Sequence, residues 1–443
     1  MSQKNIIEEK KKIGFWPTTS LAIGNMIGSG VFLLPAALAF YGGISIFGWI
    51  FTVIGALFLA LVFSRLSKLI TKAGGPYTYS REGFGEFSGF LVAWGYWISI
   101  WCANGAIAVA GVGYLSFFIP ALKENYVLSA GVAIGAIWLF TFINTKSIRK
   151  VGSVQLITTI IKIIPLLLLG TIGFFYFNSS HFIPLNLSGE SNFDAITVTA
   201  ALTLWAFLGL ESATVPSDKV KNPTNTIPRA TIAGIVIAAL IYIFSTIGIM
   251  GIMTPGDLQN SAAPFADAAQ MIWGTWASGL IAIGAVISCF GALNGWILLQ
   301  GQIPLAAARD RLFPPSFKQV SSKGIPVIGL IIGSILASFL VTLNYTRGLV
   351  HMFAFIIMLS TLSCLVPYIF SSLSELMLYL KKKKSYNKKR LIAAICISIP
   401  AFFYSLWAIT GLEYEVIIWG ALLLAAGIPL YGYMVLKTKS SKQ

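Results

Sequence analysis

The chain has 443 residues, of which 56% are hydrophobic and only 10% are charged, and its formal net charge is +16. A soluble domain carries about 25% charged residues, so this composition excludes a water-soluble globular protein and indicates a membrane protein with many spans. The four cysteines lie in apolar segments without paired spacing, so we expect no disulfide framework, no metal site and no cofactor.

In chain order, apolar runs long enough to cross a bilayer predict roughly twelve membrane-spanning helices. The segment before the first run mixes acidic and basic residues. It leads into an apolar stretch too long for the core of a signal peptide, so we expect the first span to be retained. The predicted spans lie near residues 14–39, 44–68, 87–119, 127–144, 152–178, 193–214, 228–254, 271–301, 325–345, 348–380, 391–411 and 414–436.

The first span has a weak centre, "GNMIGSGVFLLP" at residues 24–35, and the sixth has another at "FLGLES". Unwound backbone in a bilayer is tolerated only where it lines a cavity or is buried in protein. Two interrupted spans five apart run in opposite directions, which favours an inverted-repeat transporter with its binding site between them. The alternative is that the small residues only let helices pack closely.

The basic residues follow the predicted topology. With the N-terminus in the cytoplasm, about 28 of the 31 lysines and arginines fall in cytoplasmic segments, which is a strong positive-inside pattern. We therefore expect a multi-pass protein of the cell (inner) membrane with both termini in the cytoplasm. Topology and attraction to the lipid bilayer explain the positive charge, so nucleic acid is not an expected partner.

Two ionisable side chains lie well inside predicted spans, where each requires a function or a buried partner. Glu211 follows the break in the sixth span, and it is either a proton-titrating gate or a neutral acid that caps the broken backbone. Lys162 lies three residues before Pro165. It either satisfies carbonyl groups freed by broken helices or extends its ammonium group to the cytoplasmic surface.

Aromatic side chains occur near both interruptions. Trp205 lies six residues before Glu211, and Trp296 lies among small residues in "GALNGWILL". Tyr96 lies two turns before Asn104 in the third span. The face of a tryptophan suits a flat cation such as guanidinium, although core packing is the alternative for each ring. The sequence motifs of metalloproteases, serine hydrolases and phosphate-binding enzymes are missing, so we do not expect an enzyme.

The chain resembles the amino acid–polyamine–organocation superfamily, and within it the basic amino acid/polyamine antiporters that include arginine/agmatine exchangers. The resemblance is carried by "GNMIGSGVFLLPAALAFYGG", "KAGGPYTYSREGFG", "LWAFLGLESATV", "VKNPTNTIPRATIAG", "GALNGWILLQGQ" and "RDRLFPP". It implies an all-α, leucine-transporter-like fold of five plus five inverted-repeat helices, with helices 1 and 6 broken, two extra helices, and a homodimer. The single domain, 1–443, would hold repeats at about 13–178 and 193–380 and the extra helices at about 391–436.

The resemblance also implies a site for a small-molecule amino acid or amine substrate, with different residues in contact with each end of the substrate. The carboxylate and amino group of an amino acid would contact Met26, Ser29, Gly30, Trp205 and Leu208. Trp296 would stack on the middle of the substrate or on its guanidinium group, and the distal cationic head would meet Ser99, Ile100, Asn104 and Ser360. The gating residues would be Tyr96, Glu211, Tyr368 and, on the cytoplasmic side, Tyr77. Lys162 resembles the structural cation at the sodium-site position of sodium-independent permeases.

The function that this resemblance implies is exchange of extracellular arginine for intracellular agmatine. Some positions depart from the exchanger pattern: Ser99 and Ile100 stand where a small residue and a cysteine are typical, Ala292 replaces a serine, and Lys162 has no counterpart. Two alternatives therefore stay open. One is a sodium-independent uniporter or proton-coupled symporter for lysine, ornithine or neutral amino acids. The other is a membrane sensor that does not transport.

Overall fold

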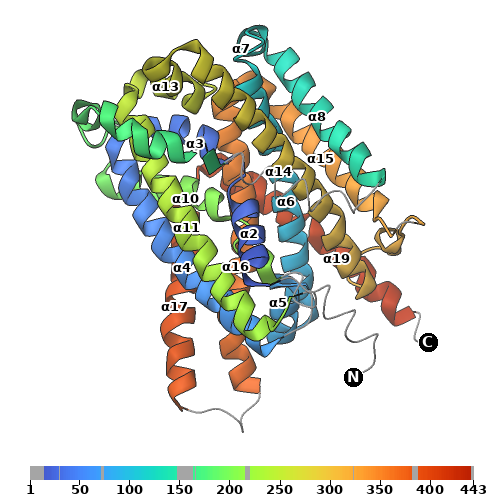
Figure 1. The fold of residues 1–443 in the computed structure, drawn as a ribbon. Coiled ribbons are helices and arrows are strands. Elements are labelled where there is room, and N and C mark those ends of the chain that lie inside the picture. Colours follow the sequence, from blue (N-terminus) through green and yellow to red (C-terminus); the bar gives the residue numbers. More distant parts are fainter. Residues whose placement is uncertain are drawn as a thin grey trace.

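The computed structural model describes residues 14–28, 30–70, 74–146, 163–164, 166–214, 220–322, 324–381 and 388–440. These residues form a bundle of long helices, joined by short helices and turns at its two ends (Figure 1). Nine helices in the described part of the chain are long and apolar enough to cross a membrane, and the bent pair over residues 15–39 makes a tenth.

Apart from the fifth span, 152–178, each span that was predicted to be uninterrupted overlaps a long helix of the structure. They are α4 (Ser45–Leu69), α6 (Glu86–Leu115), α8 (Tyr126–Lys146), α11 (Pro223–Ile252), α14 (Thr275–Arg309), α15 (Val327–Asn344), α16 (Leu349–Lys381) and α17 (Lys388–Thr410). The helices α18 (Tyr414–Ala425) and α19 (Gly427–Ser440) together make the last span. The helix α14 begins and ends later than the predicted bounds 271–301, because Gly274, with its positive φ of 82°, precedes its first residue and the mostly apolar segment after Gly301 stays helical to Arg309.

The two predicted interruptions are present. In the first span, α2 (Phe15–Met26) and α3 (Gly30–Ala39) meet at an angle of 41°. In the sixth span, α10 (Asn192–Leu204) gives way to the 3₁₀ turns η4 (Trp205–Phe207) and η5 (Ser212–Thr214).

The predicted fifth span, 152–178, falls largely outside the described residues. Its described end forms a short apolar helix, Leu166–Tyr176, whose last part is the 3₁₀ turn η2 (Ile172–Tyr176).

The short elements lie at opposite ends of the bundle. At one end, α5 (Pro76–Phe84) lies near the start of α2, and the end of α16 and the start of α17 lie at this end too (Figure 1). At the other end lie α7 (Ala121–Glu124) and α13 (Pro264–Trp273), with α12 (Pro255–Gln259) just before α13 in the chain. The remaining turns are η1 (Gly42–Ile44), η3 (Ser179–Phe182), η7 (Pro315–Lys318) and η8 (Tyr345–Arg347).

The helix α6 is the centre of the bundle. The protein buries 94% of its most apolar window, against 28% for α17 at the periphery. Its C-terminal half is rich in glycine and alanine, which lets neighbouring backbones approach closely. A Cβ atom at Gly113, for example, would lie 2.5 Å from the carbonyl oxygen of Ala262. Because α6 packs against α8, α14, α15 and α16, side chains along it can reach several helices at once.

Candidate substrate site

The break in the sixth span is built from backbone that no continuous helix could adopt. After η4, Leu208 is extended, with a ψ of 135°, and Gly209 has a φ of 96°. Only glycine takes such a positive φ without strain. The hydroxyl of Tyr242 donates a hydrogen bond of 3.0 Å to the carbonyl oxygen of Ala206. That bond satisfies one of the acceptors which the interruption leaves inside the membrane.

The two interrupted spans lie against each other. A Cβ atom at Gly209 would be 3.3 Å from Cβ of Asn25 and 3.4 Å from Cζ2 of Trp296. A Cβ atom at Gly30 would be 2.3 Å from Nε1 of Trp205. Close approach therefore requires glycine at position 30, whereas the positive φ requires it at position 209, and the indole rings of Trp205 and Trp296 lie where the two spans meet.

The three residues expected to form a gate lie together. The hydroxyl of Tyr96, on α6, donates to Oε1 of Glu211 at 2.5 Å, and that of Tyr368, on α16, donates to Oε2 at 2.8 Å. Glu211 is fully buried. Its backbone carbonyl accepts hydrogen bonds from the amide and the hydroxyl of Thr214. One carboxylate thus joins two helices to the break.

The residues expected at the distal head form two pairs. The hydroxyl of Ser360 donates to the carbonyl oxygen of Ser99 at 2.8 Å, and the two hydroxyl oxygens are 3.1 Å apart. Ile100 is buried beside them on α6. The side chain of Asn104 donates to Oε1 of Gln300 at 2.7 Å, while its own Oδ1 has no hydrogen-bond partner among the described residues.

The candidate site is closed to both sides of the membrane. Every described residue expected to contact substrate is buried, and the most exposed of them, Trp205, shows only 6% of its surface. Met26 and Leu208 are buried with it. Ser29 and Lys162 lie outside the described residues, so their roles stay predictions.

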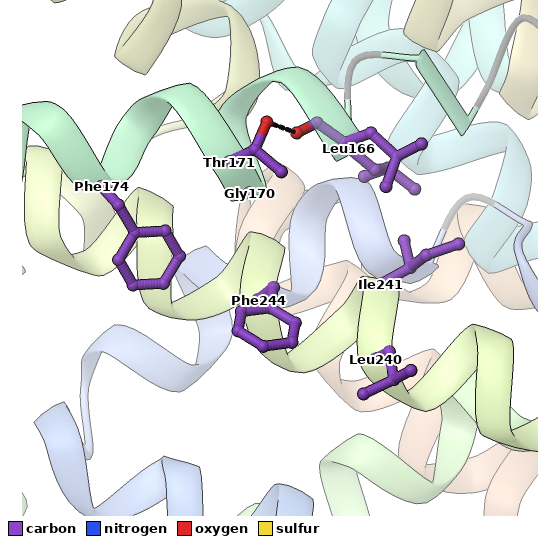
Figure 2. A pocket seen from close by; sticks show the side chains of 8 residues that line it. Leu166, Gly170, Thr171, Phe174, Leu240, Ile241 and Phe244 are labelled. Atoms are coloured by element: carbon purple, nitrogen blue, oxygen red, sulfur yellow. Dashed lines mark hydrogen bonds between the residues drawn. The ribbon is translucent and has the colours of Figure 1, made fainter.

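An open apolar groove of about 390 Å³ lies elsewhere, between residues 166–174 and α11. Figure 2 shows Phe174 and Phe244 on its wall, together with Leu240. Leu240 and Phe244 are exposed, at 53% and 49%. None of the expected site residues lines this groove. It belongs to the outer surface of the bundle and not to the substrate site.

A polar cluster at the α5 end was not predicted beyond Tyr77. The hydroxyl of Tyr77 donates to Oδ2 of Asp310 at 2.6 Å, and Arg81 pairs with the same oxygen at 3.0 Å. These contacts tie α5 to the C-terminal end of α14. Burial, followed by the hydrogen bond to Asp310, raises the pKa of the Tyr77 phenol above its usual value of 10.0.

At the α13 end the contacts are mostly aromatic. The ring of Phe32, on α3, lies 5.7 Å from that of Tyr114 and 5.4 Å from that of Phe265. The hydroxyl of Tyr114 donates to the carbonyl oxygen of Phe32 at 2.7 Å and accepts from the amide of Phe265 at 3.3 Å. This cluster packs α3, α6 and α13 together over the meeting point of the two breaks.

The sequence relationships agree with this geometry. The family model for amino acid permeases matches residues 13–430. The chain belongs to the amino acid permease family. It is 34% identical over 403 residues to the cadaverine/lysine antiporter of Escherichia coli (strain K12), covering 89% of this chain and 88% of that one. It is 32% identical to a putrescine transporter of Haemophilus influenzae, covering 97% and 98% of the two chains. It is also 33% identical to a proposed arginine/ornithine antiporter of Bacillus subtilis (strain 168), covering 99% and 100%.

Solved structures confirm the expected fold. A manganese transporter mutant of Eremococcus coleocola superposes with a TM-score of 0.61 over 96% of both chains, at 13% sequence identity. Such a likeness bears on the fold alone. Among the described residues, no group of three or more histidine, cysteine or acidic side chains is placed to hold a metal ion.

The family and the fold together identify a multi-pass membrane transporter of the amino acid and polyamine antiporter type, and not an enzyme. Its relatives carry lysine, cadaverine, putrescine, arginine and ornithine in their names.

The raised pKa of Tyr77 leads to a prediction about pH. Because its phenol ionises only above its usual range, Tyr77 keeps its proton throughout about pH 5 to 8 and holds Asp310 in the same way across that interval. Replacing Tyr77→Phe removes the hydrogen bond at the α5 end. We expect the maximum transport rate to change roughly fivefold, as for the loss of about 1 kcal/mol, with the shape of the pH profile unchanged.

The measurement is the rate of substrate flux in proteoliposomes from about pH 5 to 8, an interval that lies well below the usual phenol pKa of about 10. Tyr414→Phe is the matched control, because Tyr414 is 79% exposed and lies at the start of α18. A flattened pH profile in Tyr77→Phe would contradict the prediction and make Tyr77 part of the proton-sensing machinery.

Proposed function

We propose that the protein exchanges extracellular arginine for intracellular agmatine across the cell membrane. The observation that carries the proposal is the position of Trp296, whose indole lies within van der Waals distance of the Gly209 site where the two interrupted spans meet. A buried tryptophan face binds a delocalised cation such as guanidinium favourably. The first backbone amides of α3, which begins at Gly30, suit the carboxylate of the substrate, and Ser29 and Met26 are the proposed partners of its amino group.

The charges near this position support a cationic substrate. Asn104, Ser99 and Ser360 are neutral groups with oxygen acceptors, and Glu211 supplies the one carboxylate among the described residues that we assign to the site. In this arrangement the carbonyl oxygen of Ser99 accepts one hydrogen bond from Ser360 and has a second lone pair, so a distal head binds there either beside Ser360 or after that bond rearranges. We propose that Tyr96, Glu211 and Tyr368 form the barrier that such a rearrangement opens.

A second candidate pair has specific support. The relatives include a cadaverine/lysine antiporter and a putrescine transporter, and Ser99 with Ile100 departs from the pattern typical of arginine/agmatine exchangers. Exchange of lysine for cadaverine is the same type of exchange, because in both pairs an amino acid enters and its decarboxylation product leaves. The tryptophan face favours arginine because guanidinium is planar, whereas an ammonium group is compact.

The orientation in the membrane is also a proposal. The helix ends near α5 carry basic residues, including Lys68, Arg81 and Lys381. The start of α2, the end of α16 and the start of α17 lie at the same end of the bundle (Figure 1). The positive-inside pattern therefore supports a cytoplasmic α5 end with both termini in the cytoplasm. Assembly as a homodimer stays a prediction.

Counterflow with a controlled membrane potential tests the exchange. Proteoliposomes are loaded with agmatine, arginine, cadaverine, lysine or buffer, and uptake of labelled arginine is measured. We expect uptake only into vesicles with internal substrate. Arginine carries one net positive charge and agmatine carries two, so each cycle moves one positive charge out. A positive interior should therefore speed arginine–agmatine exchange and leave arginine–arginine exchange unchanged.

Each other outcome has a distinct meaning. Uptake into vesicles loaded with buffer alone would contradict obligatory exchange and favour a uniporter or a proton-coupled symporter. Faster uptake into vesicles loaded with cadaverine, with lysine as the preferred external substrate, would replace the arginine–agmatine pair by lysine–cadaverine. Binding without any flux would favour a sensor.

The assigned role of Trp296 predicts a selective loss of affinity. In Trp296→Ala, we expect arginine and agmatine to bind more weakly by about 1–2 kcal/mol because a desolvated cation–π contact is lost. Leucine should lose less, if it binds at all. Trp276→Ala is the control, since Trp276 lies on the same helix but is 69% exposed. Equal losses for charged and neutral substrates, measured by competition binding, would leave Trp296 with a packing role only.

Glu211 predicts a different kind of defect. A glutamine carries one acceptor oxygen in place of two carboxylate oxygens, so in Glu211→Gln one of the hydroxyls of Tyr96 and Tyr368 loses the charged acceptor to which it donates and faces an amide nitrogen that can only donate. We expect exchange to slow at least tenfold, the cost of about one hydrogen bond to a charged group, and its pH dependence to flatten. Glu190→Gln, in an exposed loop, is the control. A pH profile that keeps its shape in Glu211→Gln would assign proton sensing to another group.

A further inference from the structure

Gln300 is the hub of a buried polar network that crosses four helices. Its side-chain nitrogen donates to the carbonyl oxygen of Leu330 at 2.7 Å and to the hydroxyl of Ser334 at 2.9 Å. Its side-chain oxygen accepts from Asn104 at 2.7 Å. Ser334 continues the network to the hydroxyl of Thr141 at 2.6 Å. Gln300, Asn104 and Ser334 are completely buried, so water does not satisfy these groups.

The network has only one consistent direction. The carbonyl of Leu330 can only accept a hydrogen bond, so the Gln300 nitrogen must face α15 and its oxygen must face α6. Thr141 donates to the carbonyl oxygen of Ile137 at 2.7 Å, so Ser334 donates to Thr141 and accepts from Gln300. Asn104 must then present its nitrogen to Gln300. A backbone carbonyl on α15 thus fixes which way the amide of Asn104 is turned.

The oxygen of Asn104 is left over by this arrangement. Oδ1 is buried and has no hydrogen-bond partner among the described residues. A buried acceptor without a partner costs folding free energy unless a bound ligand donates to it. Gln300 follows Trp296 by four positions, so both project from the same face of α14. The unpartnered oxygen therefore belongs to a region within about one helical turn of the tryptophan. A group that donates N–H bonds would satisfy it.

We infer that Gln300 is a positioning residue for substrate selection, because it turns the oxygen of Asn104 toward the distal end of the site. This inference rests on the proposed function. It names the selected class as substrates whose distal head donates hydrogen bonds, such as guanidinium and ammonium groups. A head that presents a carbonyl oxygen at the same place meets another oxygen and is rejected. Without Gln300, the amide of Asn104 is free to turn and accept either kind of head.

Arginine and citrulline are a suitable pair of probes, because citrulline has the same length but carries a carbonyl oxygen in place of one guanidinium nitrogen. The variant is Gln300→Met, which keeps the size and the unbranched shape of the side chain and removes its amide. Inhibition of labelled arginine exchange by each compound is measured in proteoliposomes for the full chain. Gln302→Met is the matched control, two positions along the same helix and outside the network.

We expect wild-type protein and Gln302→Met to prefer arginine strongly. In Gln300→Met the ratio of the citrulline to the arginine inhibition constant should fall roughly tenfold or more, the size of a lost or unfavourable hydrogen bond to a charged group. The maximum rate should change much less than this ratio. Ser334→Ala, one step further along the network, should shift the ratio in the same direction by a smaller factor.

A double variant tests whether Gln300 acts through Asn104. Asn104→Ala combined with Gln300→Met should show the same ratio as Asn104→Ala alone, because coupled residues are not additive. If Gln300→Met slows all substrates equally and keeps the ratio, Gln300 only packs α14 against its neighbours and the inference is wrong, while the proposed function stands. If wild-type protein itself does not prefer arginine over citrulline, both the proposed function and this inference fail.

Discussion

The buried carboxylate of Glu211 is the constraint on which the centre of the structure depends. A carboxylate in the membrane interior is costly unless its oxygens are satisfied, and here each oxygen accepts from one tyrosine. Because Tyr96 and Tyr368 lie on different helices, α6 and α16 must converge on the break of the sixth span. Glu211 itself lies in irregular backbone between η4 and η5, so any movement of the adjoining half-helix changes both bonds together. The contacts of Tyr96 and Tyr368 with Glu211 are thereby coupled to the shape of the break.

The sequence predicted those features whose free-energy cost in the bilayer can be recognised from a short stretch of residues. Interrupting a helix inside a bilayer is expensive, so glycines and polar residues at positions 24–30 and 207–212 have few structural explanations, and both breaks are present. Glu211 was identifiable for the same reason, since a lone acid stands out in an apolar span. The tyrosines that bind it were expected only from the family resemblance, because nothing in the pattern around Tyr96 or Tyr368 distinguishes them from packing aromatics.

Contacts that depend on how helices face each other were not predictable. Gln300 is one polar residue near the end of a long apolar run, where it could equally face solvent, and the sequence gives no sign that it binds Asn104 on a helix almost 200 positions away. Asp310 in "RDRLFPP" resembles a solvated charge at a helix end, yet it accepts from both Tyr77 and Arg81. The predicted contacts of Ser29 and Lys162 concern residues outside the described part of the chain.

The contacts at the two ends of the bundle differ in chemistry, and this difference bears on how an antiporter works. At the α5 end, hydrogen bonds and an ion pair around the partly exposed Asp310 hold the contact, and such partly solvated bonds are individually weak. At the α13 end, buried aromatic packing around Phe32 does the same. A transporter must keep its alternative states within a few kcal/mol of each other, since a substrate shifts them only by its differential affinity. Separate contacts at the two ends, with the Glu211 bonds between them, meet that requirement better than one strong contact that would have to break as a whole.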